Sequence, residues 1–294
     1  MSSYEDFKYF VRYVLAPSIL VLGLSGNLMG IATFLRKKFN NFEFGPKNMF
    51  VYLLIMDNLY LIQILNTYLT YAYNIAITSF SEWICRSYFF FNYSLDPIPA
   101  YLLLYISVDR LVSVKYPAHK RFLRKEKVQL MFLFGILGLN LVLYSPLLFL
   151  DEIYYRNNSV FGCNFIDIDT QNLILLAGLV NRIIIPFVLM IICSVLLTYT
   201  VFRSRRNFSN RINLITLKKD VKFSITSILL NFVYIFLNLP AIIVFLIPSL
   251  YIYDVFVNFG LYIFYMCYAV EFYLILISNS MVRKEFFKML KCLN

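Results

Sequence analysis

Charged residues are scarce in this chain: they make up 15% of its 294 residues, against 61% hydrophobic and 19% aromatic residues. This composition excludes an ordinary soluble globular protein and is typical of a membrane protein. The chain has one tryptophan and one histidine, His119, and it shows no metal-ligand cluster, nucleophile triad or phosphate-binding loop. We therefore expect no metal site, no cofactor and no enzymatic activity.

Long apolar stretches occupy most of the chain. Each has roughly the 20 residues that an α-helix needs to cross a bilayer. The seven stretches are Val11–Leu35, Met49–Ile77, Tyr88–Val114, Val128–Leu150, Leu173–Phe202, Phe223–Leu250 and Val255–Ile277. The prediction is an all-α membrane protein, a seven-transmembrane helix bundle forming one domain over residues 1–294, with Ser204–Asn213 as a loop between spans five and six.

Positive charge is concentrated in every second connection between these spans. The connections after spans one, three and five, together with the tail, hold 22 of the 27 lysine and arginine residues. Short loops rich in these residues stay in the cytoplasm, so we expect a multi-pass plasma-membrane protein with its N-terminus extracellular and its C-terminus cytoplasmic. The net charge of +11 then favours contact with anionic lipids, and we expect no nucleic-acid partner.

The chain has five cysteines. Cys193 and Cys267 lie inside spans, and Cys292 lies near the predicted cytoplasmic end. Cys85 and Cys163 both fall on the predicted extracellular side, where disulfides persist. We predict a bridge between them, worth on the order of 4 kcal/mol of lost freedom in the unfolded chain.

Three further features flank the spans. Asn157 begins an Asn-Asn-Ser glycosylation sequence on the predicted outer side. Residues 280–291 predict a short amphipathic C-terminal helix that lies in the membrane plane. Cys292, at the end of that helix, is either a palmitoylation site or an unmodified cysteine.

Ionisable groups inside the spans are costly unless they are paired or solvated, so each is a candidate functional residue. These residues are Asp57, Asp96, Asp109, Arg110, Arg182 and Glu271. Asp109 and Arg110 lie at the inner end of span three, and Asp220 lies at the inner mouth of span six. A carboxylate there can hold Arg110; the alternative is an ordinary charged pair at a helix end.

Several short motifs share one order and spacing with a known family. They are Gly26-Asn27, Leu54-Ile55-Met56-Asp57, Trp83 two residues before Cys85, Asp109-Arg110-Leu111, Tyr116-Pro117, Pro146, Pro186 and Pro240. Together they resemble the rhodopsin-like (class A) G-protein-coupled receptors over essentially the whole chain. The resemblance implies a receptor that binds an extracellular ligand and activates a heterotrimeric G protein.

The resemblance also implies roles for individual residues. Asn27 and Asp57 match the polar pair that links helices one, two and seven. Arg110 matches the arginine that meets the G protein, and Asp220 resembles the acid that restrains it at rest. The inner mouth opens when helix six moves outward from a hinge at Pro240, and an agonist acts through its higher affinity for the open state.

The chain departs from the family pattern at several positions. Leu111 and Asn238 replace the usual tyrosine and tryptophan, and Pro99 replaces a hydroxyl that commonly helps to hold sodium. Glu271 stands at the start of the altered Asn-Pro-x-x-Tyr motif in span seven. By hypothesis Asp57 and Glu271 face each other, in which case at least one is protonated.

The resemblance places the ligand pocket between helices three, five, six and seven. Asn92, Asp96, Arg182 and Asn238 are its candidate residues. Asp96 and Arg182 either meet a charged ligand group or form a pair that only joins helices three and five. Asn92 stands where amine receptors have an aspartate, and span seven lacks the lysine that retinal requires.

The ligand class is predicted from the outer face, which is rich in acids and favours a cationic ligand such as a peptide; the alternative is ordinary loop solvation. Phe236–Pro240 and Ser278–Arg283 resemble invertebrate neuropeptide receptors of the FMRFamide-like kind. A transporter or channel is the rival prediction, although no inverted repeat is present. An atypical, non-signalling receptor is the other alternative.

Overall fold

The computed structural model describes residues 2–36, 47–73, 75, 77–116, 119–156, 159–165, 168–207, 211–246 and 254–291. Within these residues, seven helices are long and apolar enough to cross a membrane, and we number them one to seven in chain order. Large apolar side chains such as Val21, Met131, Val142 and Phe232 are more than 60% exposed on their outer surfaces. An apolar outer surface of this extent suits hydrocarbon rather than water. The predicted seven-transmembrane bundle is confirmed.

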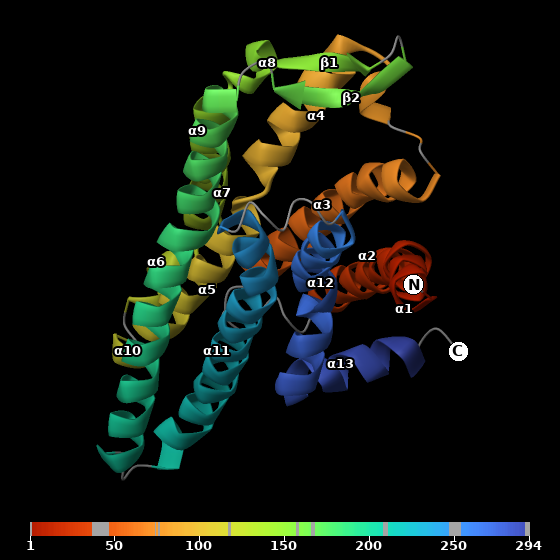
Figure 1. Ribbon diagram of the computed structural model, residues 1–294. Helices are drawn as coiled ribbons and strands as arrows, with labels where there is room; N and C mark the ends of the chain where they lie inside the picture. Colours follow the sequence, from red (N-terminus) through yellow and green to blue (C-terminus); the bar gives the residue numbers. More distant parts are fainter. Residues whose placement is uncertain are drawn as a thin grey trace.

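The helices of the bundle pack side by side (Figure 1). Helix one consists of α1 (Ser2–Tyr9), the π-helix η1 (Phe10–Leu15) and α2 (Ala16–Phe34); helix two is α3 (Lys47–Tyr73), followed by the 3-10 turn η4 (Ile77–Ser79). Helix three is α4 (Glu82–Leu95) with α5 (Ile98–Lys115), and α6 (Lys120–Leu123) leads to helix four, α7 (Glu126–Tyr144), which ends in α8 (Leu147–Leu150). Helix five joins α9 (Ile168–Leu179), the π-helix η5 (Val180–Ile184) and α10 (Ile185–Asn207); helix six is α11 (Arg211–Leu246), helix seven is α12 (Asp254–Ser278), and α13 (Ser280–Lys291) follows.

Helix three is interrupted, whereas the sequence predicts one continuous span from Tyr88. It begins earlier, where the Ser81 side chain accepts a hydrogen bond from the backbone N–H of Ile84 at 3.2 Å. It then breaks between α4 and α5. Pro97 and Pro99 explain the break, because neither has an amide hydrogen to donate to the preceding turn.

Other boundaries also differ from those predicted. The predicted loop Ser204–Asn213 is mostly helical, because α10 continues to Asn207 and α11 starts at Arg211. Helix two ends at Tyr73 rather than Ile77, whose backbone N–H is instead bonded to the Asn66 side chain at 3.1 Å. The described part of helix six ends at Leu246.

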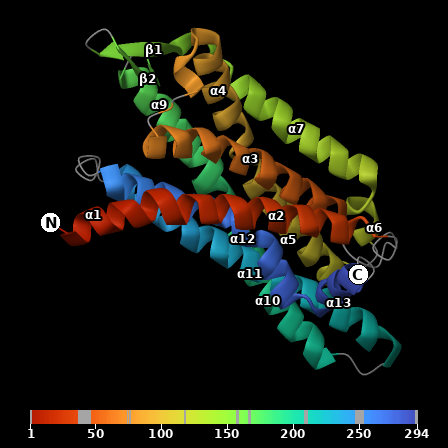
Figure 2. The same cartoon turned by 90° about the vertical axis from the view of Figure 1, so that its right-hand side faces the viewer.

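A β-hairpin that the sequence analysis did not predict connects helices four and five. Strand β1 (Asp151–Arg156) pairs in antiparallel register with β2 (Ser159–Phe165), and Cys163 lies opposite Ile153. The hairpin lies against α4 and η4 at one end of the bundle. Figure 2 shows the N-terminus at this same end, while the C-terminus, α6 and the end of α10 lie at the other.

Helix one packs closely on helices two and seven through small residues. A Cβ atom at Gly23 would lie 2.5 Å from a side-chain atom of Leu61, and one at Gly30 would lie 2.6 Å from Phe272. Only glycine allows this approach, because a larger residue would push the helices apart. The contact brings Asn27, on the same helix, into the interior.

The helix α13 follows helix seven after a turn at Asn279, whose side-chain oxygen accepts the backbone N–H of Met281 at 3.1 Å. Val282 and Phe286 are buried against the bundle. Lys284, Lys288 and the remaining basic residues lie on the exposed side. The amphipathic helix predicted over residues 280–291 is present.

Candidate functional site

A cavity of about 250 Å³ lies between helices three, five, six and seven, towards the end that holds the hairpin. Asn92, Asp96 and Arg182 line it, as the sequence predicts. The other lining residues are mainly aromatic and aliphatic: Tyr60, Tyr93, Gly178, Leu179, Ile183, Ala241, Ile242, Val257, Leu261, Phe264 and Tyr265. A largely apolar cavity with a few convergent polar groups is the usual form of a ligand site.

The floor of this cavity is built around one ion pair. Nη1 of Arg182 donates to Oδ2 of Asp96, and the hydroxyl of Tyr268 donates to Oδ1 of Asp96 at 3.1 Å. The guanidinium also lies 4.5 Å from the centre of the Phe264 ring, which adds a cation–π contact. We call Asp96, Arg182, Phe264 and Tyr268 the floor cluster.

Asn238 does not line the cavity, although it was predicted as a ligand residue. It is 1% exposed, and its side-chain nitrogen donates to the backbone oxygen of Tyr234 at 2.7 Å. This bond lies within helix six, two residues before Pro240, where proline interrupts the normal hydrogen bonding. The Asn238 side chain is thus bonded to the backbone of helix six beside the predicted hinge, and it lies outside the pocket.

The polar pair predicted in the core joins helices one, two and seven. The side-chain nitrogen of Asn27 donates to the backbone oxygen of Tyr268 at 3.0 Å. Asp57 and Glu271 interact electrostatically with each other. Both residues are almost fully buried, and none of their four carboxyl oxygens has a hydrogen-bond partner among the described residues.

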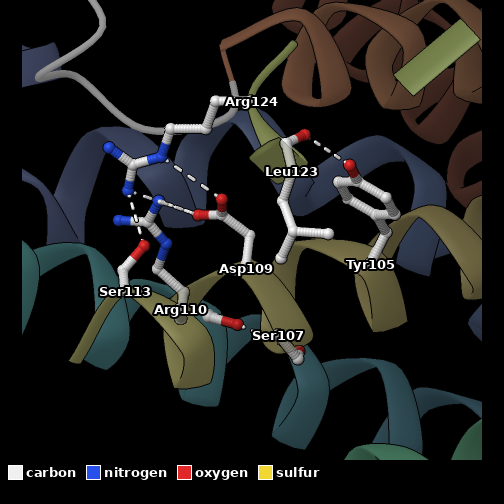
Figure 3. A network of polar contacts seen from close by, with 8 residues as sticks. Tyr105, Ser107, Asp109, Arg110, Ser113, Leu123 and Arg124 are labelled. Carbon is white, nitrogen blue, oxygen red and sulfur yellow. Dashed lines mark hydrogen bonds and ion pairs between the residues drawn. The ribbon is translucent and has the colours of Figure 1, made fainter. Parts of the chain in front are cut away.

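The inner end of helix three holds a buried network of charges (Figure 3). Asp109 is ion-paired with Arg110, its neighbour in the chain. It also accepts from Nε of Arg124 at 3.2 Å, and Nη2 of Arg124 donates to the Ser113 hydroxyl at 2.7 Å. All four residues are at most 6% exposed. The carboxylate of Asp109 therefore binds two arginines.

Arg124 is a functional candidate that the sequence analysis missed. It lies just after the short helix α6, in the connection between helices three and four. Tyr105 holds this connection against helix three, because its hydroxyl donates to the backbone oxygen of Leu123 (Figure 3). The sequence signal was weak, since Arg124 is one of seven basic residues between Arg110 and Lys127.

Arg110 also meets helix six. Its guanidinium lies 5.4 Å from the centre of the Phe223 ring. The predicted restraint by Asp220 involves a side chain outside the described residues, so that contact stays a prediction. Lys222, two residues further along α11, donates to the Ser280 hydroxyl at 2.9 Å and ties helix six to α13.

A second polar network, also absent from the sequence analysis, joins helices three, five and six above this point. The side-chain nitrogen of Asn231 donates to Ser107 at 2.8 Å and to Ser194 at 3.1 Å. Ser107 is in turn 3.0 Å from the Ser227 hydroxyl. Outward movement of helix six would separate these partners.

The structure supports the predicted disulfide at one of its two cysteines. Cys85 is disulfide-bonded, and Cys193 and Cys267 are free thiols. The side chain of Cys163 lies outside the described residues, so its pairing with Cys85 stays a prediction. The predicted modification sites Asn157 and Cys292 also lie outside the described residues.

No metal centre is built by the described residues: no group of three or more histidine, cysteine, aspartate or glutamate side chains comes together there. The site therefore consists of an outer cavity, a buried acid pair in the middle and a charge network at the inner end. The cavity and the charge network both include residues of helix three, and the acid pair joins helices two and seven. The arrangement suits binding at one end and a conformational response at the other.

Comparison with known protein families matches residues 26–271 to the family described as 7 transmembrane receptor (rhodopsin family). Among curated proteins, the chain is similar to galanin receptor 2b of Danio rerio, with 27% identity over 143 residues. That similarity covers 48% of this chain and 37% of the relative. The chain thus spans little more than a third of the length of the curated relative that it matches.

Proposed function

We propose, from the premise that this chain belongs to the rhodopsin family of seven-transmembrane receptors, that it binds an extracellular peptide and activates a heterotrimeric G protein. Binding takes place in the cavity above the floor cluster. The response is an opening of the inner mouth, as helix six moves away from helix three. The hairpin end of the bundle faces the outside, and α13 lies on the cytoplasmic side.

The observation that carries this proposal is the buried arginine at the inner end of helix three. Arg110 is 1% exposed and is held by Asp109 and against Phe223 of helix six. A buried guanidinium is costly unless it is paired. Separating helix six from helix three would uncover it for a cytoplasmic partner, which is how a receptor of this family signals.

A peptide is the favoured ligand class because a galanin receptor, by its name a receptor for a peptide, is a relative. The sequence resemblance to invertebrate neuropeptide receptors points to the same class. The predicted preference for a cationic peptide rests on the acidic outer face. This preference for a cation does not extend to the cavity floor, because Arg182 is more exposed there than its partner Asp96.

A ligand screen tests the proposal. Cells that express the receptor would be exposed to a library of neuropeptides, and dissociation of each class of G protein would be measured. A response that requires the receptor is the expected result. If no G protein responds and the purified chain carries ions or solutes across liposomes, the transporter prediction replaces this one; binding of a peptide without any G-protein response would identify a non-signalling receptor.

Arg124→Leu is expected to reduce G-protein activation about tenfold, a coupling of typical size. When Arg110 leaves Asp109, Arg124 remains as the only described partner of that buried carboxylate. Without it, opening would leave an unpaired buried charge, which costs several kcal/mol. Nucleotide exchange on a purified G protein measures the effect.

The matched control for this prediction is Arg121→Leu, the same change at an exposed arginine three residues earlier. It should leave exchange unchanged. Arg124→Lys should recover part of the activity, since it restores the charge but not the two-pronged contact. Higher exchange in Arg124→Leu than in the wild type would contradict the assigned role.

A further inference from the structure

The floor cluster joins three of the four helices that surround the cavity, and the fourth contacts it directly. Asp96 lies at the end of α4 in helix three, Arg182 lies in helix five, and Phe264 and Tyr268 lie in helix seven. Helix six is joined through Tyr234, whose hydroxyl donates to the backbone oxygen of Arg182 at 3.3 Å. A change in the position of Arg182 therefore acts directly on helix six.

The backbone is irregular on both sides of the ion pair. Asp96 lies at the break between α4 and α5, next to Pro97. Arg182 lies in the π-helix η5, which interrupts helix five. Proline breaks and π-helical turns are the usual places where a helix bends, and they often mark functional sites. Two helices that can bend are thus fastened to each other at the points where they bend.

We propose that the floor cluster holds the resting receptor closed, and that an agonist opens it by offering Arg182 a hydrogen-bond acceptor, a carboxylate or carbonyl oxygen, in place of Asp96. This inference rests on the proposed receptor function and specifies the ligand chemistry and regulation of the same cavity. In the closed state the ion pair joins helices three and five. Its loss without a replacement partner is costly for the guanidinium of Arg182, so the closed state persists until a ligand supplies an acceptor, while Asp96 keeps the hydrogen bond from Tyr268.

The geometry selects an acceptor rather than a cation. Both oxygens of Asp96 are engaged, and its side chain is 7% exposed, against 23% for Arg182. Among the described residues, Nη1 is the one guanidinium nitrogen that forms a hydrogen bond, and Nε has no partner. Arginine has five N–H donors and no acceptor. A ligand group that reaches the floor therefore meets the partly exposed guanidinium of Arg182 and its N–H donors before it meets Asp96.

The size of the cavity limits what reaches the floor. Its volume of about 250 Å³ is below the range of roughly 300–1,000 Å³ that holds a complete drug-sized ligand. One aromatic or aliphatic group with its acceptor fits, and the rest of a peptide would stay above. The aromatic rings of Tyr60, Tyr93 and Tyr265 supply the apolar walls.

The cluster also explains how the receptor works with Asn238 at the position of the usual tryptophan. Asn238 is buried and bonded within helix six, so it cannot report a ligand in the cavity. The contact from Tyr234 to the backbone of Arg182 provides the route from the cavity to helix six. Tyr234 is 1% exposed and moves only with its neighbours.

The closing role is tested without any ligand, on the purified full chain in nanodiscs. Asp96→Asn should raise ligand-independent nucleotide exchange about tenfold, and Tyr268→Phe a few fold, in line with ordinary coupling energies. Tyr262→Phe is the matched control, because it removes a buried hydroxyl from the same helix at a residue that belongs neither to the floor cluster nor to the cavity lining. The double variant Asp96→Arg with Arg182→Asp should return exchange towards the wild-type level.

A distance measurement separates this inference from the proposed function. Spin labels at Met131 on helix four and Ile225 on helix six, both outward-facing, would be placed in a Cys193→Ser, Cys292→Ser background. The labels should move apart in Asp96→Asn and Tyr268→Phe but not in Tyr262→Phe. If the labels move apart but no Gα subunit exchanges nucleotide, the proposed G-protein coupling is overturned and the closing role is retained. If the wild type shows nucleotide exchange but Tyr268→Phe changes neither the distance between the labels nor the exchange rate, the closing role alone is overturned.

The ligand chemistry is tested with fragments that fit the cavity. Millimolar benzoate and benzamide should raise the thermal unfolding midpoint of the wild-type receptor, and benzylamine should not. Arg182→Gln should lose the response to benzoate. Stabilisation by benzylamine, an equal response in Arg182→Gln, or no response to either acceptor fragment would overturn the assignment of an acceptor.

Discussion

Arg110→Leu is expected to abolish G-protein activation, with a loss of about 100-fold or more, the upper end of ordinary coupling energies. Ligand binding in the cavity should be preserved, because Arg110 lies at the opposite end of helix three from Asn92 and Asp96. Nucleotide exchange on purified G protein measures the first property, and binding of a peptide found in the screen measures the second. Surface expression should be compared at the same time.

The reason for this large effect is the degree of burial. Arg110 is among the largest fully buried side chains of the protein. Its guanidinium contacts Asp109 and Phe223 in the closed state. In the open state the same five donors become available to a cytoplasmic partner. A leucine fills the space but offers no donor, so the open state gains nothing from the partner.

Two controls make this result decisive. Arg121→Leu places the same substitution on an exposed arginine of the same inner face and should leave exchange unchanged. Arg110→Lys keeps the charge but loses the planar fork, and should retain a small part of the activity. Wild-type exchange rates in Arg110→Leu, at equal surface expression, would overturn the proposed role of the inner network.

The bundle itself was predictable from the sequence because hydrocarbon imposes a simple rule. A span must satisfy its own backbone hydrogen bonds, so long apolar runs become helices. The rule fixes where a helix is needed but not where it ends. Helices α10 and α11 therefore extend through most of the predicted loop at Ser204–Asn213, since water does not prevent a helix from continuing.

Two local features were visible in the sequence but were not predicted. Pro97 and Pro99 signal the break in helix three, because proline removes the donor that a continuous helix needs. The β-forming residues Ile153 to Tyr155 before Asn157-Asn158, and Val160 and Phe161 after it, are typical of a hairpin and lie in β1 and β2. Both signals were hidden by the strong hydropathy around them.

Side-chain partnerships were less predictable than helices. An ion pair between Asp96 and Arg182 was one of two alternatives that the sequence left open, because a buried charge demands an opposite one, and the structure forms this pair. Arg124 was missed, since its partner Asp109 lies 15 residues earlier and the contact depends on the fold of the intervening connection. Asn238 was placed among the pocket residues by resemblance, whereas its side chain donates to the backbone oxygen of Tyr234, four residues earlier in the same helix.

Glu271→Gln is expected to make the receptor more stable at alkaline pH. Asp57 and Glu271 interact electrostatically in a buried site, and among the described residues no lysine or arginine forms a hydrogen bond with either of them. At least one of the two carboxyls must therefore be protonated. As pH rises that proton is lost and a second buried charge appears, at a cost of about 3 kcal/mol in a membrane.

The thermal unfolding midpoint measures this effect in detergent or nanodiscs. The wild-type midpoint should fall by roughly 5–10 °C between neutral and alkaline pH, because stability that depends on a bound proton is present at low pH and lost at high pH. Glu271→Gln should fall much less, since its amide donates to Asp57 without a titrating proton. Cys267 and Tyr234 are titratable groups that also interact electrostatically with Glu271, so Cys267→Ala and Tyr234→Phe serve as controls for their contribution.

A sodium ion is the alternative occupant of the space between the two acids, and it makes the opposite prediction. A cation would stabilise two ionised carboxylates, so sodium chloride would raise the wild-type midpoint at alkaline pH relative to choline chloride. Glu271→Gln would then be less stable than the wild type in sodium. The departure from the family at Pro99 and Glu271 removes a hydroxyl and adds a carboxyl, a change that favours a shared proton over a bound cation because like charges tolerate one another only when one is neutralised.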